Sequence, residues 1–297
     1  MRSGAPRGSN TPGMQESAAR RGNRASGLAE GTSVSAMSNL VLGIDFGGTG
    51  IKGALVDLEV GDFATDEFRI PTPADSTPEN VGEVVQRIYD HFADRVGDDP
   101  VGITIPAIFS QGVVRSAANI DSSWLGVRAE EVLSKSLGRP VVMVNDADAA
   151  GYAEAKLGAA RGADGLVLVT TLGTGIGSAI VYNGVLIPNT ELGHLEIDGY
   201  DAEKRAAASI KTAEGLSYEE YLPRLERYYG AIEMLFSPDL LVVGGGISAD
   251  HELFMPQLRT KLHTPIIPAT LQNRAGIIGA ALLAAERGGL AADASGE

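Results

Sequence analysis

Residues 40–52 read LVLGIDFGGTGIK, an apolar run that leads into a glycine turn and then into a second apolar run. The first run, Leu40 to Asp45, has the composition of a buried strand, and a second strand is predicted from Ile51 to Leu58. Glycines between strands suit phosphate binding, because a backbone without Cβ atoms can approach an anion and point N–H groups at it. One such hairpin can equally be a tight turn without a ligand.

The turn matches neither of two familiar glycine motifs for phosphate. A dinucleotide fingerprint needs a helix after the glycines, and a Walker A loop needs Gly-Lys-Ser/Thr. Here a predicted strand follows residues 47–50, with Asp45 before the turn and Lys52 after it. Asp45 could hold a water bound to Mg²⁺, and Lys52 could offset phosphate charge.

The segment Gly-Thr-Gly-Ile occurs at residues 48–51 and again at 173–176, each time between predicted strands. The second pair of strands is predicted at 166–172 and 178–182, and Asn183-Gly184 predicts a hairpin that leads on to residues 185–187. A repeated strand–turn–strand unit predicts two related domains that face one another. A third turn, Gly244-Gly245-Gly246, follows a predicted strand at 240–243. It could hold a flat ring or a phosphate, or be a flexible strand-to-helix turn.

The rest of the chain alternates strands with helices. A helix that begins at Pro78 carries Val81, Val84, Val85, Ile88 and Phe92 on one face. Further strands are predicted at 63–70, 101–105 and 141–144, and helices over 146–157, much of 203–235 and 275–286. We therefore expect an α/β protein. Its small N-terminal domain spans 40–118 and is joined by the helix 275–287, its large domain spans 119–274, and segments 1–39 and 288–297 are disordered.

Polar residues interrupt the apolar pattern at three places. Asn145-Asp146 follows a buried strand, where a carboxylate can be partly desolvated and its pKa raised toward that of a general base; a helix N-cap is the alternative. Glu191 and His194 flank a glycine and suit recognition of several hydroxyls, although a lone His can also be structural or a metal ligand. Asn119 could bind a sugar hydroxyl or simply form a turn.

Composition excludes several classes of protein. The chain has 297 residues and no Cys, so it has neither disulfides nor thiolate metal sites. No apolar run approaches the roughly 20 residues that span a bilayer, so no membrane is expected. The formal net charge of −14 opposes nucleic acid, and it requires any anion site to use local donors. Residues 1–39 are rich in Arg and Ser; a disordered extension, a start at Met37 or a transit peptide would explain them.

Four motifs together resemble the ROK sugar kinases, over about residues 40 to 285. They are IDFGGTGIK at 44–52, NDADAAG at 145–151, GTGIG at 173–177 and ELGH at 191–194. Within the family, LIPNTELGHLE at 186–196 and RSAANIDSSW at 115–124 are similar to polyphosphate glucokinases. Most ROK members carry a Cys-rich zinc motif after Gly-His. This chain lacks it, as do polyphosphate glucokinases, so no zinc is expected.

The resemblance implies an actin-like ATPase (ribonuclease H-like) fold, with two α/β domains around a cleft. It implies a catalytic base, Asp146, and Mg²⁺ near Asp45. The implied sugar-binding residues are Asn119, Asn145, Asp146, Glu191, His194 and Glu203. The implied phosphate loops are Asp45, Gly47, Gly48, Thr49, Gly50 and Lys52, then Thr171, Gly173, Thr174 and Gly175, with Gly244, Gly245 and Gly246 on the nucleotide side.

The implied activity is transfer of the terminal phosphoryl group of polyphosphate, or also of ATP, to the 6-hydroxyl of glucose, by a cytoplasmic homodimer. Arg115, Lys204, Arg205 and Lys211 are candidates for a cationic track, or are scattered surface charges. A ROK glucokinase or hexokinase that uses only ATP is an alternative, and it could prefer mannose or an N-acetylated sugar as acceptor. So is a sugar-sensing regulator, but that needs a helix-turn-helix segment that residues 1–39 do not resemble.

Overall fold

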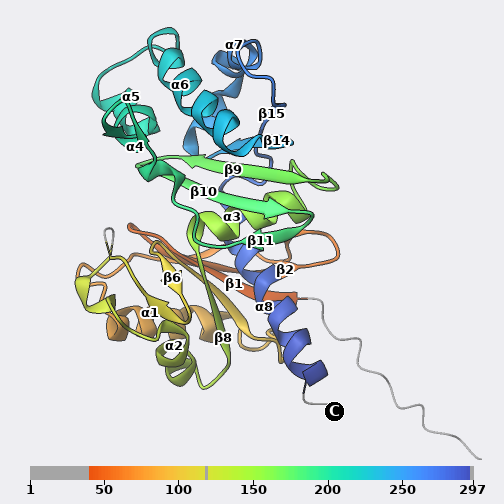
Figure 1. Cartoon of the computed structure of the whole chain (residues 1–297). Helices are drawn as coiled ribbons and strands as arrows, with labels where there is room; N and C mark the ends of the chain where they lie inside the picture. The colour runs from red at the N-terminus through yellow and green to blue at the C-terminus, as the bar shows by residue number, and fades with distance from the viewer. Residues whose placement is uncertain (1–39, 118–119, 295–297) are drawn as a thin grey trace, which may run out of the picture. The chain divides into compact units, whose positions relative to one another are not determined.

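A computed structural model of the chain describes residues 40–117 and 120–294 (Figure 1). The segment 1–39, the candidate Asn119 and residues 295–297 lie outside the described residues. From residue 40 onward, the described residues form one compact unit that contains two large sheets and two two-stranded hairpins. Among these residues, no helix combines the length and apolarity that crossing a membrane requires.

The first sheet grows from the predicted opening hairpin. β1 (Leu40–Phe46) pairs antiparallel with β2 (Ile51–Asp57), and Asp45 lies opposite Lys52. The strand order is β3-β2-β1-β5-β8, and β4 also pairs with β2. β5 and β8 run parallel to β1. The bounds are β3 (Asp62–Phe63), β4 (Phe68–Ile70), β5 (Val101–Ile105) and β8 (Val141–Asn145).

The second sheet repeats this order and these directions. β9 (Leu166–Leu172) pairs antiparallel with β10 (Ile176–Tyr182), and the sheet order is β11-β10-β9-β14-β15. β14 (Leu240–Gly244) and β15 (Ile266–Pro268) are parallel to β9, as β5 and β8 are to β1. Asn183 and Gly184 have φ angles of 48° and 78°, and the predicted hairpin leads to β11 (Val185–Ile187). The duplication predicted from Gly-Thr-Gly-Ile is confirmed.

Helices cover both faces of each sheet. α1 (Pro78–Phe92) and α2 (Ala129–Leu137) pack on one face of the first sheet, and α8 (Ala275–Ala294) packs on the other. α3 (Asp146–Lys156) contacts α8 on one side and β9 and β10 on the other, so α8 and α3 join the two sheets (Figure 1). α6 (Tyr218–Phe236) packs on the far face of the second sheet, with Tyr221, Leu225 and Tyr229 buried.

Glycines allow these layers to approach closely. A Cβ at Gly43 of β1 would lie 2.1 Å from the Ile277 carbonyl oxygen of α8, and one at Gly102 of β5 would lie 2.0 Å from that of Ala280. A Cβ at Gly279 of α8 would lie 1.9 Å from the carbonyl oxygen of α3 residue Ala149. Real atoms cannot approach so closely, so these contacts between layers exist only because side chains are missing.

The shorter elements complete the chain. They are the hairpins β6 (Phe109–Ser110) with β7 (Val113–Val114) and β12 (Glu196–Ile197) with β13 (Tyr200–Asp201), the helices α4 (Glu203–Ala206), α5 (Ala208–Ala213) and α7 (Met255–Arg259), and the 3-10 turns η1 (Ser122–Trp124), η2 (Leu192–His194), η3 (Gly246–Leu253) and η4 (Gln272–Arg274).

Two predicted elements are wrong in extent. The strand predicted at 63–70 is two short strands, because residues 64–67 bulge between the Phe63–Val56 and Phe68–Gly53 pairs. The Thr65 hydroxyl accepts the Leu55 N–H at 3.1 Å and so takes the place of a ladder partner. The last helix continues to Ala294, beyond the end predicted at 287, since alanine and leucine after residue 289 favour a helix.

A strand of the first sheet and a helix that packs on this sheet lie beyond the predicted domain boundary at residue 118. β8 lies within the segment 119–274 that was assigned to the large domain, yet it is the edge strand of the first sheet. α8 packs on the first sheet through β1, β2, β5 and β8. The boundary at residue 118 stays a prediction.

Candidate active site

Asn145 ends β8 and caps α3. Its side-chain oxygen accepts the backbone N–H groups of Ala147 at 2.9 Å and Asp148 at 3.1 Å, and its amide donates to the Ala107 carbonyl at 3.1 Å. The N-cap predicted as an alternative is therefore present, but at Asn145. Asp146 is released from that role and stands as the first residue of the helix.

The side chain of Asp146 is exposed, although the residues around it are buried. The buried residues are those of β8 before it and of α3 after it. The pKa of its carboxyl group is raised to about 6, mainly by desolvation in the surrounding protein and also by the negative charges of Asp45 and Glu191. The hydrogen bond from the Ala147 N–H opposes this shift. A carboxylate in this state can accept a proton near neutral pH.

Glu191 belongs to a loop that β10 holds firmly. The buried Ser178 hydroxyl donates to the Thr190 carbonyl at 2.5 Å and accepts the Leu192 N–H at 2.9 Å. These bonds fix the backbone on both sides of Glu191. Burial raises the pKa of Glu191, nearby His194 lowers it, and Glu203 raises it. Glu191 is therefore fixed in place within electrostatic reach of Asp146.

His194 and Glu203 meet at the second glycine turn. His194 Nδ1 lies 3.8 Å from Glu203 Oε1 and 3.9 Å from Asp201 Oδ2. Glu203 Oε2 accepts the Ile176 N–H at 3.4 Å, and a Cβ at Gly175 would lie 2.5 Å from that oxygen. Glu191, His194 and Glu203, which are distant in sequence from Asp146, thus form one polar cluster beside it.

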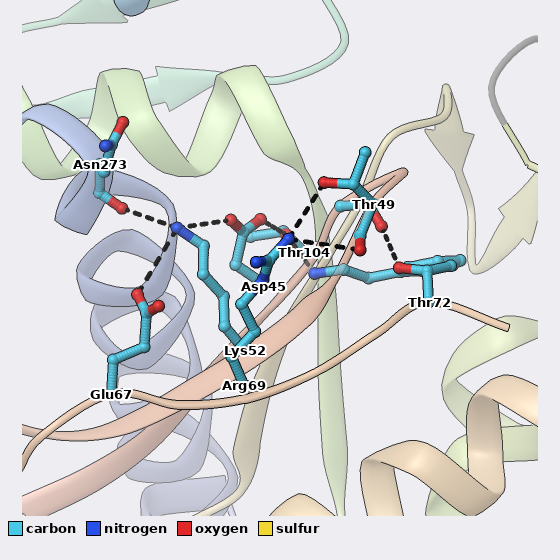
Figure 2. Close-up of polar contacts among 10 residues, drawn as sticks. Asp45, Thr49, Lys52, Glu67, Arg69, Thr72, Thr104 and Asn273 are labelled. Atoms are coloured by element: carbon cyan, nitrogen blue, oxygen red, sulfur yellow. Dashed lines mark hydrogen bonds and ion pairs between the residues drawn. The ribbon is translucent and has the colours of Figure 1, made fainter.

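The first glycine turn is braced from several sides (Figure 2). The Gly47 N–H donates to the Gly50 carbonyl at 3.1 Å, and the Thr72 hydroxyl donates to the Gly47 carbonyl at 2.6 Å. Asp45 Oδ1 accepts the hydroxyl of Thr104 on β5 at 2.7 Å. The carboxylate is thereby held at the end of β1, beside the turn.

The second turn is one residue shorter and is also closed by a backbone hydrogen bond. The Gly173 N–H donates to the Gly175 carbonyl at 3.0 Å, and the Ser209 hydroxyl donates to the Thr174 carbonyl at 2.6 Å. A Cβ placed at Gly48 or at Gly173 would meet none of the described atoms within 4 Å, so both turns have open space above them.

The third glycine turn lies against the second. Gly244 is paired with Thr171 at the end of β9. Gly245 has a φ of 79°, and a Cβ there would lie 2.4 Å from the Leu172 carbonyl oxygen. The predicted residues Thr171, Gly173, Thr174, Gly175 and 244–246 are therefore brought together.

The proposed cationic track is less well supported. Lys204 pairs with Asp201 at 3.1 Å, Arg205 stacks 3.9 Å from the ring centroid of Tyr200, and Lys211 lies 4.2 Å from that of Tyr218. Each of these cations thus has a local partner. Arg115 is exposed and follows the β6–β7 hairpin, in a different part of the chain. The track stays a prediction.

Two residues near the site were not singled out from the sequence. Asp148 is 1% exposed; its Oδ2 accepts the Asn189 N–H at 2.7 Å, whereas its Oδ1 has no partner among the described residues. Asn189 in turn accepts the Phe109 N–H at 2.9 Å, and so ties the β6–β7 hairpin to the loop that carries Glu191. Arg69 lies on β4, and its side chain donates to Thr49 of the first glycine turn. In the sequence, Asp148 stood out only by its position two residues after Asp146. No sequence pattern pointed to Arg69.

Mg²⁺ is compatible with this arrangement. The described residues contain no group of three or more His, Cys, Asp or Glu that could hold a metal. Mg²⁺ needs no such cage, because it keeps several waters and uses one or two carboxylates together with substrate phosphates. Asp45 is held rigidly beside the open first turn, and its charge is felt at Asp146. Asp45 offers one fixed carboxylate of this kind.

Comparisons with known proteins agree with this geometry. A polyphosphate glucokinase of Mycobacterium tuberculosis (strain CDC 1551 / Oshkosh) is 46% identical over 241 residues, which are 81% of this chain and 89% of the relative. A glucokinase of Streptomyces coelicolor is 28% identical and covers 83% of this chain and 98% of its own length. The crystal structure of the inorganic polyphosphate/ATP-glucomannokinase from Arthrobacter sp. strain KM has a TM-score of 0.78 at 52% identity, and the match covers 84% of this chain and 99% of that one.

The duplicated sheets and this structural likeness confirm the predicted actin-like ATPase fold. The family model described as "ROK family" matches residues 41–215, which are more than half of the sequence. The chain therefore belongs to the ROK family.

Proposed function

We propose that the chain transfers the terminal phosphoryl group of inorganic polyphosphate to the 6-hydroxyl of glucose and forms glucose 6-phosphate, with ATP as a second donor. The relative with 46% identity is a polyphosphate glucokinase, and the Arthrobacter enzyme is named for both donors. The observation that carries the proposal is the Asp146 carboxylate. It is exposed, its pKa is raised to about 6, and it lies within electrostatic reach of both Asp45 and Glu191.

In this mechanism Asp146 accepts the proton of the 6-hydroxyl while that oxygen attacks the terminal phosphorus of the donor. The P–O bond to the rest of the donor breaks, and the leaving oxygen keeps the bonding electrons. Phosphoryl transfer depends mainly on alignment and on charge stabilisation. A carboxylate fixed at the start of α3 by the Asn145 cap meets the first requirement.

The acceptor side would be formed by residues that recognise sugar hydroxyls. Glu191, His194 and Glu203 offer two carboxylates and an imidazole at one place. The oxygen of Asn145 is used by the helix cap, and one of its N–H groups binds Ala107, so only the second N–H is left for a sugar. Asn119 remains a further candidate outside the described residues.

The donor side would be formed by the two glycine turns. Their open surfaces at Gly48 and Gly173 can admit phosphate oxygens close to backbone N–H groups. Residues Thr49, Gly50, Thr174 and Gly175 complete these turns, and residues 244–246 would lie on the nucleotide side when ATP is the donor. Mg²⁺ would be held through Asp45 and would neutralise charge on the donor phosphates.

One coupled assay tests the proposal. The full chain is given glucose and Mg²⁺ with either polyphosphate or ATP, and formation of glucose 6-phosphate is followed. We expect turnover with polyphosphate. Turnover with ATP alone would support the alternative kinase, and no turnover with either donor would refute the proposed function. A homodimer, a cytoplasmic location and the two predicted domains also stay proposals.

A further inference from the structure

Lys52 is already neutralised within the protein. Its Nζ lies 3.5 Å from Asp45 Oδ2 and 3.6 Å from Glu67 Oε2, and it donates to the Asn273 carbonyl at 3.1 Å (Figure 2). The two carboxylates compensate the charge of the ammonium group, and the Asn273 carbonyl accepts one of its three N–H donors. Lys52 therefore links the first sheet to the segment that precedes α8, and its positive charge is already compensated by two carboxylates.

Arg69 is the cation that faces the first glycine turn. It lies opposite Lys52 on the neighbouring strand β4, and its side chain is exposed. One terminal nitrogen donates to the Thr49 hydroxyl at 3.2 Å and to the Thr49 carbonyl at 3.3 Å (Figure 2). A Cβ at Gly50 would lie 2.3 Å from Arg69 Nε, so the guanidinium rests against the backbone of the turn.

The charge of Arg69 is also uncompensated nearby. No carboxylate oxygen of the described residues lies within 4 Å of its nitrogens, although many other cations of the chain have such a partner. A guanidinium has five N–H donors, and the Thr49 contacts use only one nitrogen, so the remaining donors are available for an anion. A protein with a net charge of −14 needs such a local cation to attract a polyanion.

We propose that Arg69 binds the phosphate chain of the donor at the first glycine turn, and that Lys52 serves as a structural link. This inference rests on the proposed function, because it assumes that a phosphate chain occupies the turn. A planar fork suits two phosphate oxygens at once, and the same side chain would orient the Thr49 hydroxyl toward the donor.

The test measures binding of a labelled polyphosphate of defined length to the full chain, with glucose present and over a range of salt concentrations. Arg69→Gln is compared with Arg69→Lys, and with Arg87→Gln as a control that removes one exposed positive charge from α1. We expect Arg69→Gln to raise the polyphosphate Kd by about tenfold or more, as loss of a charge-assisted contact would. It should also weaken the salt dependence of Kd, because one ionic contact is gone.

Arg69→Lys should recover part of the affinity and most of the salt dependence, and Arg87→Gln should leave both unchanged. Thermal melting of each variant checks that it is folded. A Kd for Arg69→Gln within about twofold of the wild type would overturn the inference. The inference would also be overturned if both Arg69 variants bound polyphosphate equally weakly while their Kd kept the salt dependence of the wild type. That result would mean that Arg69 has a merely structural role. A wild type that binds polyphosphate but does not phosphorylate glucose would refute the proposed function, and the binding comparison would still test Arg69.

Discussion

Replacing Asp148 by asparagine should change how the stability of the protein depends on pH. Asp148 is 1% exposed, and only one of its carboxylate oxygens has a partner among the described residues. Its pKa is raised from the ordinary 3.8 to about 7, mainly by burial and also by the charges of Glu191 and Asp146. The folded protein therefore holds this proton at pH values where the unfolded chain has released it.

The sign and size of the effect follow from this difference. Between about pH 4 and pH 7 the folded state binds more protons at this group than the unfolded state, so the free energy of unfolding falls as the pH rises. The window spans about three pH units, and each unit corresponds to about 1.4 kcal/mol. The upper limit of the effect is thus about 4 kcal/mol. Asparagine has nearly the same shape and does not titrate, so Asp148→Asn should lose this pH dependence.

Denaturant unfolding of the wild type and the variant at about pH 4.5 and about pH 8 measures the effect. Burying an amide changes the free energy of unfolding of the variant by the same amount at both pH values. The difference in this free energy between variant and wild type should nevertheless shift by several kcal/mol in favour of the variant at the higher pH. Asp164→Asn, at an exposed carboxylate after α3, should show no such change. A gap for Asp148→Asn that stays the same at both pH values would refute the burial argument.

Three further predictions concern the site. Because the pKa of Asp146 is raised to about 6, kcat/KM for glucose should fall about tenfold per pH unit below that value; a flat profile down to about pH 4.5 would contradict the assignment. Gly245→Ala should lower the free energy of unfolding by about 2 kcal/mol or more, because its φ is 79° and a Cβ would strike Leu172, whereas Gly246→Ala has open space and should change little in the same denaturation experiment. Ser178→Ala should cost about 1–3 kcal/mol of stability and raise the KM for glucose, since its two bonds hold the Glu191 loop; an unchanged KM would show that the loop is fixed by other contacts.

Local patterns in the sequence predicted most of the fold. The apolar run at 40–45, the Asn183-Gly184 hairpin and the helix from Pro78 each depend on neighbouring residues, and all three formed as expected. The repeated Gly-Thr-Gly-Ile predicted the duplication, and in the structure each copy follows one strand and leads into its antiparallel partner. The bulge at 64–67 was missed because it depends on the Thr65 hydroxyl, whose bond to the Leu55 N–H bridges two strands.

The contacts of the candidate site depended on tertiary structure. Asn145 and Asp146 are adjacent in sequence, and periodicity could not tell which one caps the helix; the hydrogen bonds assign the cap to Asn145. Asp148 depends on Asn189, which is far along the chain. Arg69 faces Thr49 only because the bulge sets the register of β4 against β2. Contacts of this kind, between residues that are far apart in the chain, cannot be predicted from a single sequence.

The most direct test of the proposed mechanism replaces Asp146 by asparagine and measures both kcat, with glucose, polyphosphate and Mg²⁺, and the glucose Kd. If Asp146 is the base, kcat should fall by about 10²- to 10⁴-fold while the Kd stays close to that of the wild type. Asp148→Asn, the same change two residues along α3, should retain far more turnover. A near-wild-type kcat for Asp146→Asn would contradict the mechanism.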